Sequence, residues 1–263
     1  MNKKKIALFD MDYTILPYDS LIPFAGFVLS REPWRFHYIF AFLPACGLYL
    51  LGLIGREGLK RAFLSILWRM KRERVEELAG EFAKTIAIPL LYPDIMQDVR
   101  KLRAGGFHVV LNSASPTFYV RHIGAADFDA VVGTEVVLQD RMPFLPKIAG
   151  KNNRGIEKLL RMPDLVPAAT MATITADYPA LSKNHSEFLP DVIPGSIAYS
   201  DSSADLPMLR MCETAVLVHP SEKLAREGKT RGWQIVRPAR PYSGTLEKYV
   251  RLCLCLIGLL RLR

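Results

Sequence analysis

The chain has 263 residues, of which 50% are hydrophobic and 23% are charged, and its formal net charge is +9. This length allows one large α/β domain or a core with a smaller inserted domain, and the composition excludes an intrinsically disordered chain. The positive charge favours an anionic partner, and by itself it does not choose among a phosphorylated substrate, an acidic lipid surface and a nucleic acid.

The first residues and the cysteines indicate the cellular compartment. Met1–Lys5 carry neither an apolar segment nor a cleavage site before the strand-like run Ile6–Phe9, so no signal peptide is expected. The four cysteines form no dense disulfide framework and no metal-type spacing with histidines. We therefore expect a cytoplasmic protein, and the apolar and basic regions described below leave peripheral attachment to the inner face of the membrane open.

Short apolar runs with the character of buried strands recur along the chain. They are Ile6–Phe9, Val109–Leu111, Ala130–Val132, Ile197–Tyr199, Ala215–Val218 and Gln234–Val236. Helix-compatible stretches such as Pro93–Gly105 and Gly155–Arg161 lie between them. This alternation predicts a Rossmann-like, doubly wound, mostly parallel α/β sheet with helices on both faces. Ligands of such sheets bind at the carboxyl ends of the strands.

Two segments depart from the alternation. Residues 20–92 are helical and apolar with few strand signals, which predicts an inserted helical domain. The predicted core is then residues 1–19 and 93–248, followed by an apolar, basic tail at 249–263 that either lies on a membrane or packs on the protein. Thr170–Pro194 carries three prolines among mixed polar residues, and we expect an irregular insertion there.

Two aspartates follow the first predicted strand. Asp10 and Asp12 are separated by one residue, where the strand meets its loop. The strand end projects Asp10 into the crevice, and the turn can return Asp12 to the same ligand. One carboxylate can then attack phosphorus, while the other acts as general acid for the leaving oxygen and later as base for water. A helix N-cap or an Asx-turn would explain either aspartate alone, and it explains the pair less well.

The second predicted strand, Val109–Leu111, ends in small hydroxyl residues. The Ser113 hydroxyl and backbone N–H groups such as that of Ala114 could bind a phosphoryl group there, near a helix N-terminus. Ser115 before Pro116 also has the pattern of an ordinary N-cap with proline at the first helical position. Both interpretations stay open for this strand end.

A basic segment, Gly150–Leu160, follows the third predicted strand and contains Lys151, Arg154 and Lys158. A cation here would neutralise the charge that phosphate and nucleophile share as the carboxylate attacks. Most lysines are simply solvated. Position within the site, and not residue type, must decide among the three.

The fourth predicted strand at a candidate site delivers Asp201 at its end, and Asp205 follows in the loop before the next helix. Carboxylate oxygens suit Mg²⁺, which typically binds one or two carboxylates together with substrate phosphate and water. Two aspartates four residues apart can also serve as helix caps. The spacing thus indicates a magnesium site without excluding capping.

The order of these motifs, DxDxT, a strand ending in serine, a basic residue and a strand ending in DSxxD, resembles that of the haloacid dehalogenase (HAD) superfamily. Further segments resemble its IB subfamily, which includes phosphoserine phosphatases and phosphatidylglycerophosphatase C. They are Asp19–Phe24, Asn112–Pro116, Tyr199–Ser202, Asp205–Pro207 and Gly232–Ile235. The resemblance covers nearly the whole chain, and it implies an HAD-type α/β core with an inserted helical cap.

The resemblance also implies a role for each motif residue. Asp10 would be the nucleophile and Asp12 the general acid and base, with the Asp12 backbone carbonyl among the ligands of Mg²⁺. Ser113 would hold the phosphate. Asp201 would bind Mg²⁺, and Asp205 would support it.

Two positions depart from parts of the subfamily. Phosphoserine phosphatases place the motif lysine just before the glycine, where this chain has Arg154, whereas members that resemble lipid phosphatases place it where Lys158 stands. We therefore assign Lys158 as the motif lysine, with Arg154 and Lys151 as alternatives. Tyr13 is bulky where many relatives have a small residue, and we expect it to narrow the entrance.

The predicted cap bears on the substrate. Asp19 stands where phosphoserine phosphatases bind the substrate amine with an acidic residue, and it could equally cap the first cap helix. Phe36–Gly55 contains no Asp, Glu, Lys or Arg and is followed by a basic cluster at residues 56–74. A single membrane crossing there would put Asp10 and Asp201 on opposite sides, so the run must be a buried helix pair, a re-entrant hairpin or an interfacial element. Pro44 and Gly47 favour a break near its middle.

Three functional hypotheses follow. The leading one is a Mg²⁺-dependent phosphomonoesterase that forms an aspartyl-phosphate and acts on an amphiphilic or lipid phosphate such as phosphatidylglycerophosphate, with an anionic membrane surface as an additional partner. The alternative is a soluble small-molecule phosphatase of the phosphoserine phosphatase type. A third hypothesis, from another class, is a membrane-associated scaffold without turnover. No nucleic acid is expected as a partner, because the basic residues do not alternate with aromatic ones.

Overall fold

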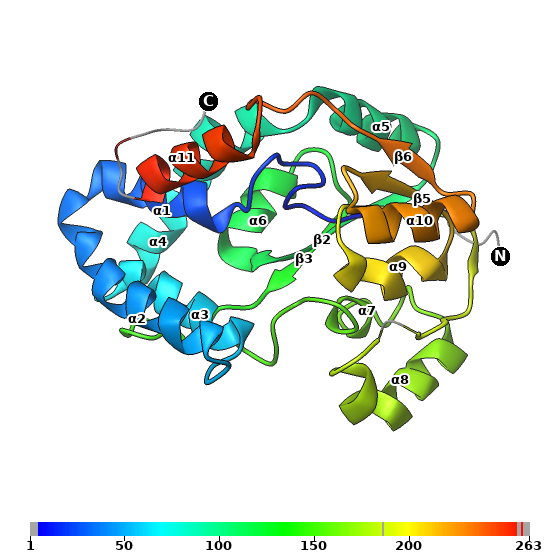
Figure 1. Cartoon of the computed structure of the whole chain (residues 1–263), viewed down its shortest axis with the longest axis horizontal. Helices are drawn as coiled ribbons and strands as arrows, with labels where there is room; N and C mark the ends of the chain where they lie inside the picture. The colour runs from blue at the N-terminus through cyan, green and yellow to red at the C-terminus, as the bar shows by residue number, and fades with distance from the viewer. Residues whose placement is uncertain (1–4, 186, 257–258, 260–263) are drawn as a thin grey trace.

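The computed structural model describes residues 5–185, 187–256 and 259. A parallel six-stranded sheet in the order β3-β2-β1-β4-β5-β6 forms its centre (Figure 1). The strands are β1 (Ile6–Phe9), β2 (His108–Pro116), β3 (Ala130–Thr134), β4 (Ile193–Ser200), β5 (Cys212–Val218) and β6 (Gln234–Val236). The predicted doubly wound parallel sheet is confirmed, and β1 lies where the strand order reverses, the position at which such sheets bind ligands.

Strand β1 is buried on both faces, which explains its continuous apolar sequence. Ala7 and Phe9 pack into one hydrophobic cluster, and Ile6 and Leu8 pack into the other. The helices that contribute to the first cluster include α1 (Leu21–Arg31), α4 (Arg72–Phe82), α5 (Pro93–Ala104), α6 (Thr117–Gly124) and α11 (Thr245–Leu256). The helices of the second cluster are α7 (Glu157–Leu160), α8 (Ala168–Leu181), α9 (Leu206–Met211) and α10 (Glu222–Thr230).

The helical insertion follows β1 and forms one end of the molecule (Figure 1). Between α1 and α4 it contains η1 (Pro33–Tyr38), α2 (Ile39–Leu50), α3 (Arg56–Phe63) and η2 (Leu64–Leu67), and after α4 it contains η3 (Ala83–Ala87) and η4 (Ile88–Leu90). Phe24 of α1 stacks on Tyr119 of α6 at 5.1 Å between ring centroids and meets the edge of Phe82 at 5.3 Å. The insertion therefore shares a hydrophobic core with a helix of the sheet domain.

The apolar run Phe36–Gly55 forms helix α2 and the turn after it, and α3 packs back on α2 as the second arm of a hairpin. The chain does not break where Pro44 and Gly47 led us to expect. Helix α2 runs through both residues, and the reversal comes after Leu50. Gly52 has a φ of +72° there, a left-handed conformation that glycine adopts readily and that proline, fixed near −65°, cannot adopt. Among the described residues no helix has both the length and the hydrophobicity needed to cross a membrane.

Two further expectations need correction or comment. Thr170–Pro194 is not irregular throughout, because helix α8 covers its first part and only Asp177 within the helix is non-helical, two residues before Pro179. The Ala-rich sequence before that kink is a strong helix former. In the predicted tail, helix α11 packs on α1 with Leu252 and Cys255 buried, and residues 257, 258 and 260–263 lie outside the described part.

Candidate active site

A cavity of about 520 Å³ opens at the carboxyl ends of β1, β2 and β4. Loops after these strands form its floor, and helices α1, α2 and α3 of the insertion form its walls. Polar residues from both parts line it. They are Asp10, Asp12, Asp19, Arg56, Lys60, Ser115, Asn152, Arg154, Lys158, Asp201, Ser202 and Asp205.

Asp10 is fixed by the strand that precedes it and by the turn that follows. Its backbone N–H donates to Tyr199 O at 3.0 Å, which continues the pairing of β1 with β4. The next turn folds tightly around the Met11 carbonyl, with Tyr13 at a φ of 60°. The turn brings Thr14 back to the strand end, where its Oγ1 donates to Asp10 Oδ2 at 3.1 Å.

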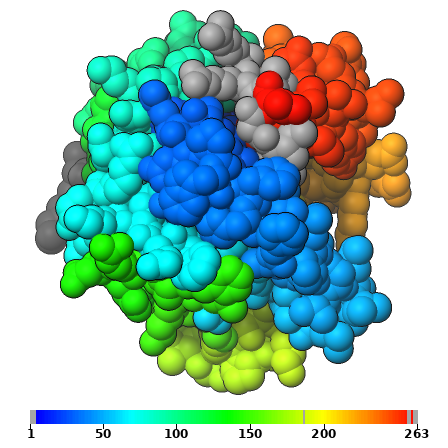
Figure 2. Space-filling view, turned by 90° about the vertical axis from the view of Figure 1, so that its left-hand side faces the viewer, coloured from blue at the N-terminus to red at the C-terminus, as the bar shows by residue number. Residues whose placement is uncertain are grey.

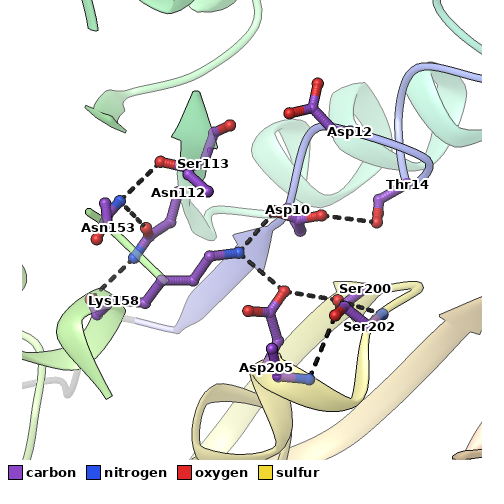
Figure 3. Close-up of polar contacts among 12 residues, drawn as sticks. Asp10, Asp12, Thr14, Asn112, Ser113, Asn153, Lys158, Ser200, Ser202 and Asp205 are labelled. Carbon is purple, nitrogen blue, oxygen red and sulfur yellow. Dashed lines mark hydrogen bonds and ion pairs between the residues drawn. The ribbon is translucent and has the colours of Figure 1, made fainter. Parts of the chain in front are cut away.

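Lys158 extends between two buried carboxylates (Figure 3). Its Nζ lies 2.6 Å from Asp10 Oδ1 and 2.8 Å from Asp205 Oδ2. Of the other two basic candidates, Arg154 lines the cavity, and Lys151 is exposed with its Nζ over the ring of Tyr178. Lys158 is therefore the basic residue that the fold brings to Asp10.

Two asparagines hold the backbone that carries Lys158 (Figure 3). Asn112, in β2, donates from Nδ2 to the Lys158 carbonyl at 3.0 Å. Asn153 donates to Asn112 Oδ1 at 2.7 Å and to the Ser113 carbonyl at 2.8 Å. This network ties the short helix α7 to the end of β2, so the lysine is positioned by the sheet.

Thr14 also links the two strand ends that carry Asp10 and Asp201. The Asp201 backbone N–H donates to Thr14 Oγ1 at 3.0 Å, and Thr14 Oγ1 lies 3.5 Å from Asp201 Oδ1. Asp205, in contrast, accepts from Ser200 Oγ at 2.7 Å and from Lys158. Asp201 thus lies beside the Asp10 carboxylate, and Asp205 orients the lysine.

The Asp12 carboxylate points away from Lys158 (Figure 3). Ser115 Oγ donates to Asp12 Oδ2 at 2.6 Å, and the Ser20 backbone N–H donates to Oδ1 at 2.9 Å. Burial, with the nearby charge of Asp19 as the next cause, raises the pKa of Asp12 to about 6. A carboxyl group with this pKa can exchange a proton near neutral pH, as a general acid and base must.

The charges at Asp10 and Asp201 bear on whether a metal ion fits. Burial raises the pKa of Asp10 to about 6 despite the contact with Lys158, and burial together with the charge of Asp10 raises the pKa of Asp201 to about 8. Two buried carboxylates that repel each other would be stabilised by a cation that binds both. The described residues hold no group of three or more His, Cys, Asp or Glu side chains with metal-ligand geometry. Two carboxylates with backbone, substrate and water oxygens nevertheless suit Mg²⁺.

Three residues near the end of β2, Ser113, Ala114 and Ser115, differ in their relation to the cavity. Ser113 is fully buried, does not line the cavity, and accepts the Ser115 N–H on its Oγ at 3.0 Å. Ala114 and Ser115 line the cavity. The interpretation of Ser115 as an N-cap is wrong, because β2 continues to Pro116 and the Ser115 hydroxyl binds Asp12.

Asp19 lies where the insertion begins, between the start of α1 and the cavity. Its Oδ1 accepts the Leu21 N–H at the start of α1 at 3.1 Å, and the residue also lines the cavity. Burial raises its pKa, with the charges of Lys60 and Arg154 acting in the opposite direction.

Lys60 is the main residue at this site that sequence reasoning missed. It reaches from α3 to the end of β2, where its Nζ donates to the Ala114 carbonyl at 2.6 Å and to Asn152 Oδ1. Burial lowers its pKa to about 8. Nothing in the sequence distinguishes Lys60 from its neighbours Arg56 and Arg61. Thr14 was also missed as a site residue, although the DxDxT motif contains it.

Comparison with known proteins finds one family model and several solved structures similar to this chain. Residues 7–210 match the family model described as haloacid dehalogenase-like hydrolase. The chain is 27% identical over 245 residues to the inhibition of morphological differentiation protein of Streptomyces azureus, covering 89% of this chain and 79% of that protein. A protein of unknown function from Bordetella pertussis Tohama I has a similar structure, with a TM-score of 0.66 and 23% identity over 89% of this chain and 98% of that one.

A solved phosphoserine phosphatase that contains an analogue of the phospho-aspartyl intermediate has a TM-score of 0.50 and 16% identity, covering 91% of this chain and 95% of that chain. At these identities the solved structures establish the fold alone. The motif order predicted a member of the haloacid dehalogenase superfamily and an enzyme of the phosphatase type. Both predictions are confirmed.

Proposed function

Because the chain belongs to the haloacid dehalogenase-like hydrolase family, we propose that it is a magnesium-dependent phosphomonoesterase in which Asp10 forms a covalent phospho-enzyme. The observation that carries this proposal is the contact of Lys158 Nζ with Asp10 Oδ1 at 2.6 Å, at a strand end that opens into the cavity. The lysine holds a buried carboxylate in one orientation and offsets part of the negative charge that would repel phosphate.

In the first step an Asp10 oxygen attacks phosphorus, the bond from Asp10 oxygen to phosphorus forms, and the bond to the leaving oxygen breaks. Asp12 donates a proton to that oxygen. Lys158 and the backbone N–H group of Ala114 would face the charge on the phosphoryl oxygens.

In the second step water attacks phosphorus, the bond from Asp10 oxygen to phosphorus breaks, and inorganic phosphate leaves. Asp12 accepts the proton of the water, so both residues return to their starting states. Ser115 holds Asp12 by the 2.6 Å hydrogen bond through both steps. Mg²⁺ held by the Asp10 and Asp201 carboxylates and the Asp12 backbone carbonyl would supply positive charge to the phosphate oxygens.

For the substrate, a small organic phosphate of the phosphoserine type is better supported than a lipid phosphate. The similarity in fold to a phosphoserine phosphatase favours it, and so do the charges of both signs along the cavity, where Asp19 lies with Arg56, Lys60 and Arg154. One observation favours an amphiphilic phosphate instead. Part of the cavity wall is apolar and is formed by Leu21, Ile22, Phe42, Leu59 and Phe63.

Release of inorganic phosphate from purified protein tests the proposal, with phosphoserine, sugar phosphates, lysophosphatidate and phosphatidylglycerophosphate as substrates, in Mg²⁺ and in EDTA. We expect turnover in Mg²⁺ only, fastest with a small soluble phosphate. Asp10→Asn should lower kcat by about a thousandfold or more, whereas Asp164→Asn at an exposed position should not. Near-normal hydrolysis by Asp10→Asn would refute the mechanism. Much faster hydrolysis of the lipid phosphates than of the soluble ones would refute the proposed substrate class and favour a lipid phosphate.

A further inference from the structure

The outer face of helix α2 leaves large hydrophobic side chains uncovered. Phe40 is 79% exposed and Leu50 is 84% exposed, and Leu43, Leu51 and Leu53 beside them are exposed as well. Figure 2 looks onto this end of the molecule, where the blue and light-blue surface belongs to α1, η1, α2 and α3. Contiguous apolar surface of this kind on a protein usually marks an interaction site.

Helix α2 is apolar on all sides, as its sequence without charged residues requires. Its inner side packs on α3, where the Phe42 ring meets the edge of the Phe63 ring at 4.9 Å between centroids, and Ala45 is buried. Phe42 and Tyr49 of the same side line the cavity. A helix that is hydrophobic all round is normally covered all round. Within the described part of the chain, the outer side has no such cover.

Aromatic side chains extend this apolar surface toward the loop after β3. Trp34 stacks on His37 at 5.7 Å, His37 meets the edge of Trp68 at 5.5 Å, and Trp68 meets Phe144 at 5.5 Å between ring centroids. Trp34, Trp68 and Phe144 are exposed. We call these three residues, together with Phe36, Phe40, Leu43, Leu50, Leu51 and Leu53, the α2 face.

Positive charge borders the α2 face. Arg69 lies over the ring of Trp68 at 5.9 Å, and Lys71 and Arg72 follow it as exposed residues. The backbones of Lys71 and Arg141 pair in an isolated antiparallel β-bridge, and Arg141 is also exposed. Glu73 and Asp140 are exposed acidic residues next to them, and the Asp140 carbonyl accepts the Arg72 N–H. The cations Arg69, Lys71, Arg72 and Arg141 outnumber these two acids, so the edge of the α2 face carries net positive charge.

We propose that the α2 face docks on an anionic lipid bilayer, with Phe40, Leu43 and Trp34 entering the headgroup region and Arg69, Lys71 and Arg72 contacting the acidic headgroups. Exposed Trp, Phe and Leu beside a row of basic residues match the chemistry of a bilayer interface, which is apolar below and anionic above. This inference goes beyond the catalytic proposal, because it uses the side of α2 that faces away from the cavity.

A second copy of this chain fits the same surface less well. A symmetric dimer uses the same surface patch on both copies, so the patch of one copy offers the basic edge of the other no surface of opposite charge. Like charges placed together in an interface oppose association, whereas acidic headgroups would neutralise them.

Vesicle co-sedimentation tests the proposal, with vesicles of phosphatidylcholine alone and of phosphatidylcholine with 30% phosphatidylglycerol as the probe, at about 0.05 M and 0.5 M NaCl. We expect binding to the anionic vesicles only, and weaker binding at the higher salt because screening shortens the reach of the charges. Each basic residue at an anionic surface strengthens the binding constant by about fivefold. Replacing Arg69, Lys71 and Arg72 with Gln should therefore weaken binding by about a hundredfold. Phe40→Ser with Leu43→Ser should weaken it at both salt concentrations.

Matched variants on the far side of the molecule serve as controls. Lys223→Gln, Arg226→Gln and Lys229→Gln remove three exposed cations from α10, and Leu189→Ser with Val192→Ser removes two exposed apolar side chains. These variants should bind vesicles like the unmodified protein, and all variants should hydrolyse a soluble phosphate at the unmodified rate.

Three outcomes would overturn the inference. In the first, the unmodified protein stays in the supernatant with anionic vesicles at low salt. In the second, the α10 controls lose as much binding as the α2 variants. In the third, light scattering shows a dimer that Phe40→Ser with Leu43→Ser dissociates. The last outcome would assign the α2 face to a second copy. Normal hydrolysis with no vesicle binding would refute docking and leave the catalytic proposal intact.

Discussion

The carboxyl end of the sheet and the α2 face differ in how their side chains are partnered. At the sheet, Lys158 lies between Asp10 and Asp205, and Asp12 accepts two hydrogen bonds, so nearly every polar group is fixed by another. On the α2 face, Phe40 and Leu50 lie mostly in solvent. A site for chemistry must be fixed before its substrate arrives, whereas a docking surface is completed by its partner. The two regions meet at one helix, because α2 lines the cavity with its inner side.

Of the changes that distinguish the two regions, removing the Lys158 ammonium group should have the largest effect on stability and kcat. Lys158→Met leaves the Asp10 and Asp205 carboxylates buried without their partner, which should lower the free energy of unfolding by about 3–5 kcal/mol and lower kcat by about a hundredfold or more. Urea unfolding and steady-state kinetics measure the two effects. Lys151→Met, at the exposed alternative position, should change stability by less than about 1 kcal/mol. Equal stability and activity in the two variants would show that Lys158 has no special role.

Substitutions of buried and of exposed aromatic residues in the insertion should change the free energy of unfolding by different amounts. Phe24 is fully buried between Tyr119 and Phe82, so Phe24→Ala should cost about 3–5 kcal/mol. Phe40→Ala should change the free energy of unfolding by less than about 0.5 kcal/mol, because the side chain is exposed. Denaturant unfolding of dilute protein without lipid checks both. A cost above about 2 kcal/mol for Phe40→Ala would mean that another part of the protein covers the α2 face in solution.

A smaller effect, on KM, is expected for Lys60, which reaches from α3 of the insertion to the end of β2. Burial lowers its pKa to about 8, so the ammonium group is charged below that pH and loses its charge as the pH rises through it. At saturating Mg²⁺, which keeps the Asp201 carboxylate ionised, KM for an anionic phosphate should therefore rise by about tenfold from pH 7 to pH 9, with little change in kcat. Lys60→Gln should have a raised KM that hardly varies over this range, and Lys60→Arg should keep the low KM. A Lys60→Gln profile that follows the unmodified protein would remove Lys60 from substrate binding.

The sequence predicted the sheet and its polar strand ends because both depend on local patterns. Ile6–Phe9 is apolar at every position, and the polar residues directly after it must lie at the sheet edge. The same logic located Asp201 after β4. Lys158 needed the family resemblance, since three basic residues lie in one segment and only the fold determines which one reaches Asp10.

Other features depended on packing that no local pattern contains. Helix α2 is apolar on every side, so its sequence cannot say which side meets the cavity and which side is exposed. Lys60 lies among several cations of α3, and only the approach of that helix to Ala114 distinguishes it. The chain reverses at Gly52 and not at Pro44, because a left-handed residue can turn the chain after a completed helix.

Trapping the phospho-enzyme tests the catalytic assignment most directly. Protein mixed with a substrate found in the hydrolysis assay is quenched in acid within the first turnover, digested, and examined by mass spectrometry. We predict one phosphoryl group on the peptide that contains Asp10, present with Mg²⁺ and absent from Asp10→Asn. Rapid turnover with the phosphoryl group on another residue, or with none on Asp10, would contradict the proposal that Asp10 is the nucleophile.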